Sequence, residues 1–253
     1  MNPTVHKLSL AAPAYNEAEG LAPLVNAWLA YLRQAKLAPE FEIVICNDGS
    51  KDRTGALMDE LARDNPEFKP VHHKINQGAA AALTTAIQHT QGDWVLLIDS
   101  DGQFPVDNLP RLIQAAWDTK AAAVVGVRPK KQDSAFTRFG SAMSGWLCNF
   151  FHGTHYRDFN CALKLIDGGI VRGLHLEAKG LNYSGEVMSK LLERGVRLSE
   201  VEVTHAKRTH GVSSAKALKG ARDRLLFVMY IGLRQLLLRT QVLQRPQAFR
   251  EAS

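Results

Sequence analysis

The feature that most constrains the fold is a regular alternation of short apolar segments with longer segments of helical periodicity. The stretches between the apolar segments carry apolar residues at helical spacing, so the chain repeats a strand–helix unit of about 30 residues. Because right-handed crossovers join such units side by side, we expect an α/β fold with a mostly parallel sheet flanked by helices. The segments that suit buried strands lie at residues 7–15, 41–46, 69–74, 92–99 and 121–127.

The pattern changes after Arg128. An apolar segment of helical spacing at 139–151 is followed by strand-like segments at 162–166 and 197–206, with a helix between them at about 185–194. No internal repeat or low-complexity linker divides the sequence at this point. We therefore expect the second part to complete the same domain.

Charge divides the chain more sharply than composition does. Residues 205–253 hold ten lysines and arginines against two acids, which gives this segment a charge of +8. The whole chain has a net charge of +6, so residues 1–204 carry −2. The apolar run 225–238 contains Arg234 and is shorter than the roughly 20 apolar residues that a membrane-spanning helix needs. We predict a single domain in residues 1–214 and a basic amphipathic helical tail in residues 215–253, which suits a membrane surface, a membrane-protein partner or the protein's own sheet.

The cysteines and the N-terminus bear on localisation. Cys46, Cys148 and Cys161 have no paired spacing and predict reduced thiols. The first ten residues contain no long apolar core after a charged start, so we expect no signal peptide. Together with the basic tail, these features predict a cytoplasmic protein held peripherally at the cytoplasmic face of the membrane.

Polar residues gather where the predicted strands end. Since ligands of open parallel sheets bind at the carboxyl ends of the strands, we expect these residues to line one site. They are Tyr15, Asn16 and Glu17 after the first strand, Asn47 and Asp48 after the second, Asp99, Ser100 and Asp101 after the fourth, and Arg128 after the fifth.

The apolar run 94–98 leads directly into Asp99 and Asp101. Because an unpaired carboxylate is costly to bury, the two acids lie either at a solvated strand end or around a cation. Side chains two residues apart in an extended segment can point the same way, so the pair could share Mg²⁺ or Mn²⁺. The glycine patterns of dinucleotide-binding and phosphate-binding loops are missing from the sequence, which argues against a dehydrogenase or an ATPase.

Six short motifs occur in the order and spacing of family 2 inverting glycosyltransferases, and the resemblance extends over about residues 7–215. It is greatest to the dolichol- or polyprenyl-phosphate mannose or glucose synthase branch. The resemblance implies a GT-A fold with a nucleotide-sugar half in residues 1–128 and an acceptor half in residues 129–214. The motifs are PAYNE (13–17), NDGSKDRT (47–54), NQGAAAAL (76–83), DSDGQF (99–104), GVR (126–128) and RTHGVSS (208–214).

The resemblance also implies an activity. The chain would move a sugar from a GDP- or UDP-sugar to a polyprenyl phosphate, either dolichyl or undecaprenyl, at the membrane surface, with Mg²⁺ or Mn²⁺ as cofactor. In the same pattern, Pro13, Tyr15, Glu17 and Asp48 contact the base and ribose, and Cys46 lines the pocket through its backbone. A carboxylate suits a ribose diol because it accepts two hydrogen bonds at once.

The remaining roles concern the metal and the phosphates. The resemblance implies that Asp99, Asp101 and Gln103 bind the metal as D-x-D-x-Q, with Asp101 catalytic and Ser100 in the donor site. Arginine binds phosphates well because its planar fork forms bidentate bonds. The residues implied to act on phosphates, sugar or acceptor are Arg128, Arg138 and Arg208 for the phosphates, Glu186 for the sugar or as a base, and Asp158 on the acceptor side.

Two other functions remain open on the sequence. The family branch often has lysine where this chain has Ser214, with Lys216 nearby, and this departure could signal a different acceptor, such as a hydroxyl on a glycolipid or glycan. A hydroxyl acceptor needs a general base, and family members that use hydroxyl acceptors often carry a Glu-Asp pair in the later helix. In this chain Glu186 is followed by Val187, which favours a phosphate acceptor. The non-enzymatic alternative is a nucleic-acid-binding module that uses the basic tail, and we expect no nucleic-acid partner.

Overall fold

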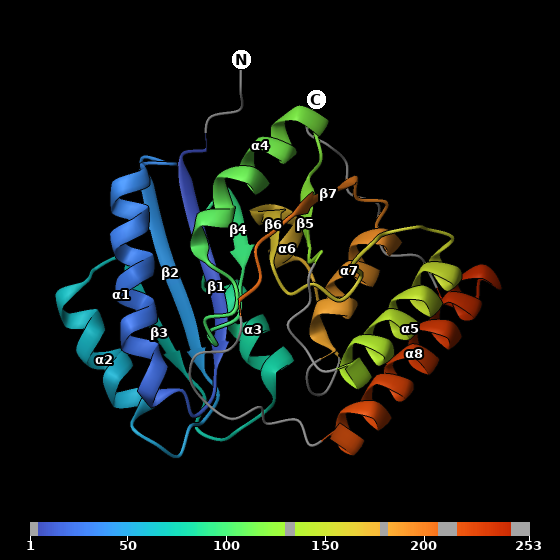
Figure 1. The fold of residues 1–253 in the computed structure, drawn as a ribbon, viewed down its shortest axis with the longest axis horizontal. Helices are drawn as coiled ribbons and strands as arrows, with labels where there is room; N and C mark the ends of the chain where they lie inside the picture. Colours follow the sequence, from blue (N-terminus) through green and yellow to red (C-terminus); the bar gives the residue numbers. More distant parts are fainter. Residues whose placement is uncertain (1–4, 130–134, 178–181, 207–216, 244–253) are drawn as a thin grey trace.

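The computed structural model describes residues 5–129, 135–177, 182–206 and 217–243. Within them, a seven-stranded sheet forms the centre of the molecule, and helices cover both of its faces (Figure 1). The strands are β1 (Lys7–Ala14), β2 (Glu40–Asn47), β3 (Phe68–His72), β4 (Trp94–Leu97), β5 (Ala123–Val127), β6 (Lys164–Asp167) and β7 (Leu198–Glu202). The helices are α1 (Ala18–Ala35), α2 (Thr54–Asp64), α3 (Ala79–Gln88), the short 3₁₀ helix η1 (Val106–Asn108), α4 (Leu109–Thr119), α5 (Ala135–His152), α6 (Gly168–Arg172), α7 (Tyr183–Glu193) and α8 (Ala217–Arg239).

The strands follow the order β3-β2-β1-β4-β6-β5-β7 across the sheet. The neighbouring pairs β3–β2, β2–β1, β1–β4 and β5–β7 are parallel, whereas β6 runs antiparallel to both β4 and β5. The predicted α/β fold with a mostly parallel sheet is therefore confirmed. The sequence pattern did not reveal that β6 separates β4 from β5, because an apolar strand reads the same in either direction.

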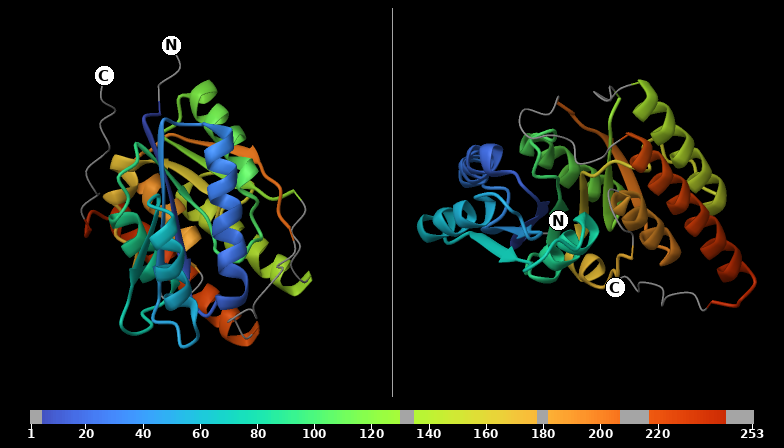
Figure 2. Two further views of the ribbon diagram at one scale, coloured as in Figure 1. Left: turned by 90° about the vertical axis from the view of Figure 1, so that its left-hand side faces the viewer. Right: turned by 90° about the horizontal axis from the view of Figure 1, so that it is seen from below.

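Two apolar layers hold the helices to the sheet. One layer joins the sheet to α1, α2 and α4, and the other joins the opposite face to α3, α6 and α7 (Figures 1 and 2). Along β1, Leu10 belongs to the first layer and the neighbouring Ala11 to the second, as expected for alternating side chains. In α3, the buried Ala80, Ala82 and Ala86 let the helix lie close to the sheet. This packing leaves the carboxyl ends of the parallel strands at one edge of the molecule.

Helix α8 packs against the domain through one of its sides. Phe227, Val228 and Ile231 are buried in the first apolar layer. The Arg234 guanidinium is bound to the carboxylate of Glu193 at the end of α7, with Nε 2.9 Å from Oε1. The predicted helix at 225–238 is thus confirmed, and the arginine that interrupts its apolar run is neutralised within the protein. No helix among the described residues is both long enough and apolar enough to cross a bilayer.

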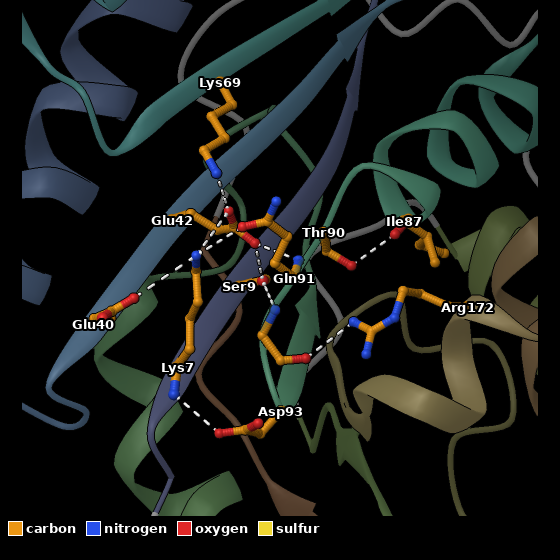
Figure 3. Close-up of polar contacts among 11 residues, drawn as sticks. Lys7, Ser9, Glu40, Glu42, Lys69, Ile87, Thr90, Gln91, Asp93 and Arg172 are labelled. Atoms are coloured by element: carbon orange, nitrogen blue, oxygen red, sulfur yellow. Dashed lines mark hydrogen bonds and ion pairs between the residues drawn. The ribbon is translucent and has the colours of Figure 1, made fainter.

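A buried carboxylate ties the three strands at one side of the sheet together (Figure 3). Glu42 on β2 is 1% exposed and accepts hydrogen bonds from Ser9 Oγ on β1 at 2.6 Å, from Lys69 Nζ on β3 at 2.5 Å and from the N–H of Gln91 at 2.5 Å. Lys7 Nζ lies 3.7 Å away. Burial by itself would raise the pKa of Glu42, but the bonds from Lys69, Ser9 and Gln91 outweigh it and hold that pKa below its ordinary value.

This arrangement predicts an acid-sensitive contribution to stability. Because the folded-state pKa of Glu42 is depressed, its contribution is complete above the ordinary value of 4.5 and is lost as the pH falls through the folded-state pKa. We expect Glu42→Gln to lower the free energy of unfolding by about 1–3 kcal/mol at neutral pH and by less at pH 3. Urea unfolding at both pH values measures this. Glu40→Gln, at a carboxylate that is 72% exposed and pairs with Lys7, is the control, and an equal loss from both variants would contradict the prediction.

Candidate active site

The carboxyl ends of β2, β1 and β4 are tied together by hydrogen bonds between their loops. Ser100 Oγ donates to the carbonyl oxygen of Pro13 at 2.7 Å, which joins the end of β4 to the end of β1. The N–H of Asn16 donates to Ser50 Oγ at 2.9 Å, and the N–H of Lys51 donates to Asn16 Oδ1 at 2.8 Å. These bonds join β1 to the turn after β2, so three of the polar strand ends lie side by side.

Four residues predicted to contact the nucleoside differ in their exposure. Pro13 and Tyr15 are half-buried at the end of β1, and Glu17 is buried where α1 begins. Cys46 is fully buried opposite Pro13 in the β1–β2 pair. Burial, together with the charge of Asp48, raises the pKa of Cys46 to about 12, so the thiol stays protonated. Cys46 is thus placed to contribute through its backbone and its bulk rather than as a thiolate.

Asp48, the fifth of these residues, is 2% exposed and binds the loop that leads into α3. Its Oδ1 lies 2.8 Å from His73 Nδ1 and accepts from the N–H of Gln77 at 2.8 Å, and its Oδ2 accepts from the N–H of Gly78 at 2.8 Å. Gly49 follows with a φ of +63°, and a Cβ there would lie 2.5 Å from the backbone of Ile75. Asp48 therefore shapes this loop, and its contact with a nucleoside remains a prediction.

The two acids that follow β4 have different hydrogen-bond partners. Asp99 is half-buried and accepts a hydrogen bond from the hydroxyl of Tyr183, and Asp101 Oδ1 accepts the N–H of Gln103 at 3.0 Å. Burial, followed by the charge of Asp101, raises the pKa of Asp99 to about 6.

The charge of Asp101 opposes ionisation of Asp99, and a cation beside the two carboxylates would relieve that repulsion. No group of three or more His, Cys, Asp or Glu side chains is placed to hold a metal ion within the residues that the structure describes. The donor set is therefore two carboxylates with the amide of Gln103 nearby. It fits Mg²⁺ or Mn²⁺, which proteins often bind through one or two carboxylates while substrate phosphates supply the other ligands.

The loop after β7 is fastened to the loop that carries these acids. The N–H of Ala206 donates to the carbonyl oxygen of Gln103 at 2.8 Å, and the rings of Phe104 and His205 lie 4.9 Å apart. Asn108 Oδ1 also accepts the N–H of Thr204 at 2.8 Å. The chain that leads toward the basic segment therefore passes beside the acidic pair. Arg208, which the sequence predicts to bind phosphate, lies outside the described residues, as do Ser214 and Lys216.

Arg128 and Asp158 form a bidentate ion pair at the end of β5. Arg128 Nε is 2.7 Å from Oδ2 of Asp158, and the second guanidinium nitrogen is 3.1 Å from Oδ1. The two side chains are 11% and 2% exposed. The charge of Arg128 also acts on Asp99, where it opposes the rise in pKa. The structure thus places a cation beside the acidic pair, with its planar fork engaged by Asp158.

The two other predicted residues lie in different surroundings. Arg138 is exposed on α5. Glu186, on α7, is fully buried, accepts the N–H of Glu177 at 2.7 Å and lies 3.7 Å from Lys190 Nζ. Its roles in sugar binding or as a base remain predictions.

Sequence reasoning missed two residues at this site, Tyr183 and Lys164. Tyr183 contacts Asp99 from the first turn of α7. Lys164 on β6 is fully buried and donates to the carbonyl oxygen of Cys161 and to Ser184 Oγ, the latter at 2.8 Å. Burial lowers the pKa of Lys164 to about 8. A lysine inside the apolar strand ALKLI was a visible signal, whereas nothing in the sequence distinguished Tyr183.

The fold is of the GT-A type. Glucosyl-3-phosphoglycerate synthase from Mycobacterium tuberculosis has a similar fold, with a TM-score of 0.65 at 16% identity over 92% of this chain and 80% of that one. Mannosyl-3-phosphoglycerate synthase from Rubrobacter xylanophilus has a TM-score of 0.64 at 16% identity over 98% of this chain and 77% of that one.

The sequence comparisons identify the family. The family model described as "Glycosyl transferase family 2" matches residues 9–170, and the chain belongs to that family. Undecaprenyl-phosphate 4-deoxy-4-formamido-L-arabinose transferase from Pseudomonas fluorescens is 32% identical over 85% of this chain and 62% of its own length. The protein of the same name from Edwardsiella ictaluri is 29% identical over 85% of this chain and 65% of its own length. The chain thus spans less than two thirds of the length of these relatives.

The buried ion pair at β5 predicts a large loss of stability when one partner is removed. Asp158→Asn leaves the Arg128 guanidinium buried beside a neutral group, and we expect the free energy of unfolding to fall by about 3 kcal/mol. Urea unfolding measures this. Glu202→Gln breaks an Arg–carboxylate pair of similar length in which both side chains are more than half exposed, and it should cost at most about 1 kcal/mol. An equal fall in the free energy of unfolding for the two variants would show that the ion pair at β5 is no more stabilising than the exposed one.

Proposed function

We propose that the chain transfers a sugar from a UDP-sugar to undecaprenyl phosphate, with inversion at the anomeric carbon. The observation that carries the proposal is the pair Asp99 and Asp101 at the end of β4, beside the linked ends of β1 and β2 and the cation of Arg128. The relatives' names supply the acceptor. The solved M. tuberculosis synthase holding Mn²⁺ and UDP supports a UDP-linked donor and a divalent cation, with GDP as the alternative nucleotide.

The protein's own residues would act mainly by binding and orientation. Pro13, Tyr15, Glu17, Cys46 and Asp48 line the nucleoside side of the site. When bound, a divalent cation supplies positive charge that stabilises the diphosphate leaving group.

The metal and the phosphates would have separate partners. Asp99, Asp101 and Gln103 hold the cation, and Ser100 fixes the end of β4 through its bond to Pro13. The arginines Arg128, Arg138 and Arg208 bind the donor and acceptor phosphates. Since Arg128 is bound to Asp158, phosphate would compete with that carboxylate for the guanidinium.

The position of Glu186 supports a phosphate acceptor over a hydroxyl acceptor. A hydroxyl acceptor needs a carboxylate base, whereas a lipid phosphate is anionic near neutral pH and attacks without one. The Glu186 carboxylate is fully buried, bound to the N–H of Glu177 and close to Lys190. These contacts suit a residue that holds the start of α7 in place better than a residue that takes a proton from a substrate.

A lipid acceptor requires access to a membrane, and α5 with α8 offers a surface for it. The two helices lie side by side on the outside of the molecule (Figures 1 and 2). Their exposed apolar side chains recur at helical spacing and are 44–66% exposed. They are Phe139, Met143, Trp146 and Phe150 on α5, and Leu225, Leu226, Met229, Leu233 and Leu236 on α8.

We call these nine residues the two-helix surface and propose that it rests on an anionic bilayer. Large apolar side chains exposed in this number on two neighbouring helices are typical of an interaction site, and exposed Trp and Phe suit the membrane interface. The basic residues Arg222 and Arg239 lie exposed on α8, which suits anionic headgroups. The domain in residues 1–214 would carry the chemistry and the tail in residues 215–253 would join α5 in membrane attachment, at the cytoplasmic face.

The transferase proposal predicts that Asp101 is essential. We expect Asp101→Ala to lower sugar transfer from a UDP-sugar to undecaprenyl phosphate by at least about 100-fold, because the leaving group loses its electrostatic stabilisation. Release of the nucleoside diphosphate, UDP or GDP according to the donor, measures the reaction in the presence of Mn²⁺ across a panel of UDP- and GDP-sugars. Asp118→Ala, an exposed acid on α4, is the matched control and should retain full activity.

The same assay separates the alternatives. Transfer to hydroxyl acceptors but not to polyprenyl phosphate would favour the glycolipid or glycan function. Steeply salt-dependent binding to RNA or DNA that Asp101→Ala leaves unchanged, with no transfer to any acceptor, would favour the nucleic-acid-binding function. We expect neither result.

The two-helix surface predicts binding to lipid vesicles. The protein should float with phosphatidylglycerol vesicles and bind phosphatidylcholine vesicles more weakly. The combined variant Trp146→Ser and Met229→Ser should bind about tenfold more weakly or worse, because two apolar side chains no longer enter the interface. Ile75→Ser, at an apolar residue that is 72% exposed but lies away from α5 and α8, is the control. Equal flotation of all three proteins would rule out this surface.

A further inference from the structure

The first residue of α7, Tyr183, is buried against the acidic pair. Its side chain is 6% exposed and belongs to the apolar layer that joins α3, α6 and α7 to the sheet. Its hydroxyl donates to Oδ1 of Asp99. A hydrogen bond from a neighbouring group fixes the rotation of a metal-binding carboxylate and is a common feature of metal sites. The bond holds Oδ1 of Asp99, and it therefore also limits the directions in which Oδ2 can point.

The first turn of α7, which carries Tyr183, is itself held in place by Lys164 on β6. Lys164 lies opposite Leu97 in the β4–β6 pair, and side chains of directly opposed residues lie on the same face of a sheet. Its ammonium donates to Ser184 Oγ at 2.8 Å and to the carbonyl oxygen of Cys161, and Ser184 Oγ donates to the same carbonyl at 2.6 Å. The residue next to Tyr183 is therefore bound to the strand that adjoins β4.

The same turn is also confined from the side. A Cβ on Gly185 would lie 2.8 Å from Oδ1 of Asn160 and 2.9 Å from the ring of Phe227 on α8. The helix thus lies in close contact with the segment after α5 and with α8, and it cannot move toward them. These contacts leave the Tyr183 hydroxyl at a fixed position beside Asp99.

We propose that Tyr183 is a positioning residue that orients the Asp99 carboxylate to receive the divalent cation, and that the contact between Lys164 and Ser184 holds it there. The proposal rests on the proposed function, because it requires Asp99 to be a metal ligand. A purely structural role is the alternative: a buried tyrosine hydroxyl needs a hydrogen-bond partner, and Asp99 would satisfy it without any effect on metal binding.

Metal binding in the absence of sugar transfer distinguishes the two roles. Mn²⁺ would be titrated into the protein with UDP present, and the signal of free Mn²⁺ would be followed by electron paramagnetic resonance. We expect Tyr183→Phe to weaken Mn²⁺ binding about 10- to 100-fold, the range found when such supporting contacts are removed. Tyr183→Met is a second variant without the hydroxyl. Tyr230→Phe removes a tyrosine–carboxylate bond to Glu177 elsewhere and should bind Mn²⁺ as the unchanged protein does.

Each outcome has a separate meaning. Weaker Mn²⁺ binding by both variants at position 183, with thermal unfolding close to that of the unchanged protein and normal binding by Tyr230→Phe, supports the positioning role. Unchanged Mn²⁺ affinity in a folded variant overturns it, and so does unfolding of both variants at the assay temperature, because the hydroxyl then serves stability. If the unchanged protein itself fails to bind Mn²⁺ with UDP, the proposed function fails instead.

Discussion

The rest of the site depends on the cost of placing two carboxylates at the end of a buried strand. Burial, followed by the charge of Asp101, opposes ionisation of Asp99. The surrounding structure offsets this cost without removing it. The hydroxyl of Tyr183 donates to Asp99, and the charges of Arg128 and Lys164 act on it from nearby. A divalent cation bound to the two carboxylates would relieve the remaining repulsion.

The strand order explains how these groups meet. If β4 and β5 were neighbours, the sheet would be a simple series of parallel strands, and the interior beside β4 would be apolar. Instead β6 enters antiparallel between them and brings Lys164 into the layer under α7. Asp158, a few residues before β6, reaches Arg128 at the end of β5. The second part of the chain thus supplies Lys164, whose charge acts on Asp99, and Asp158, which binds Arg128.

Helices α5 and α8 lie side by side on the outside of the molecule (Figures 1 and 2). On its inner side, α8 is held by apolar contacts and by the pairing of Arg234 with Glu193. On the outer side, both helices expose apolar side chains that an ordinary protein surface does not gather in such numbers. The same helix thus has a buried side and an exposed apolar side, and the turn of α7 beside Asp99 is packed against its Phe227.

The sequence by itself determined the fold class, the strand–helix series and the identity of the acidic motif, because apolar periodicity and short-range spacing are local properties. It also indicated the polar residues at the strand ends, and the structure brings those after β1, β2 and β4 together. Only the tertiary structure decided the antiparallel insertion of β6, the engagement of Asp48 and Glu186 by neighbouring backbone, and the approach of Tyr183 and Lys164 to the site. These depend on contacts between residues far apart in the chain, and the pattern of a single strand or helix does not specify which partner it will meet.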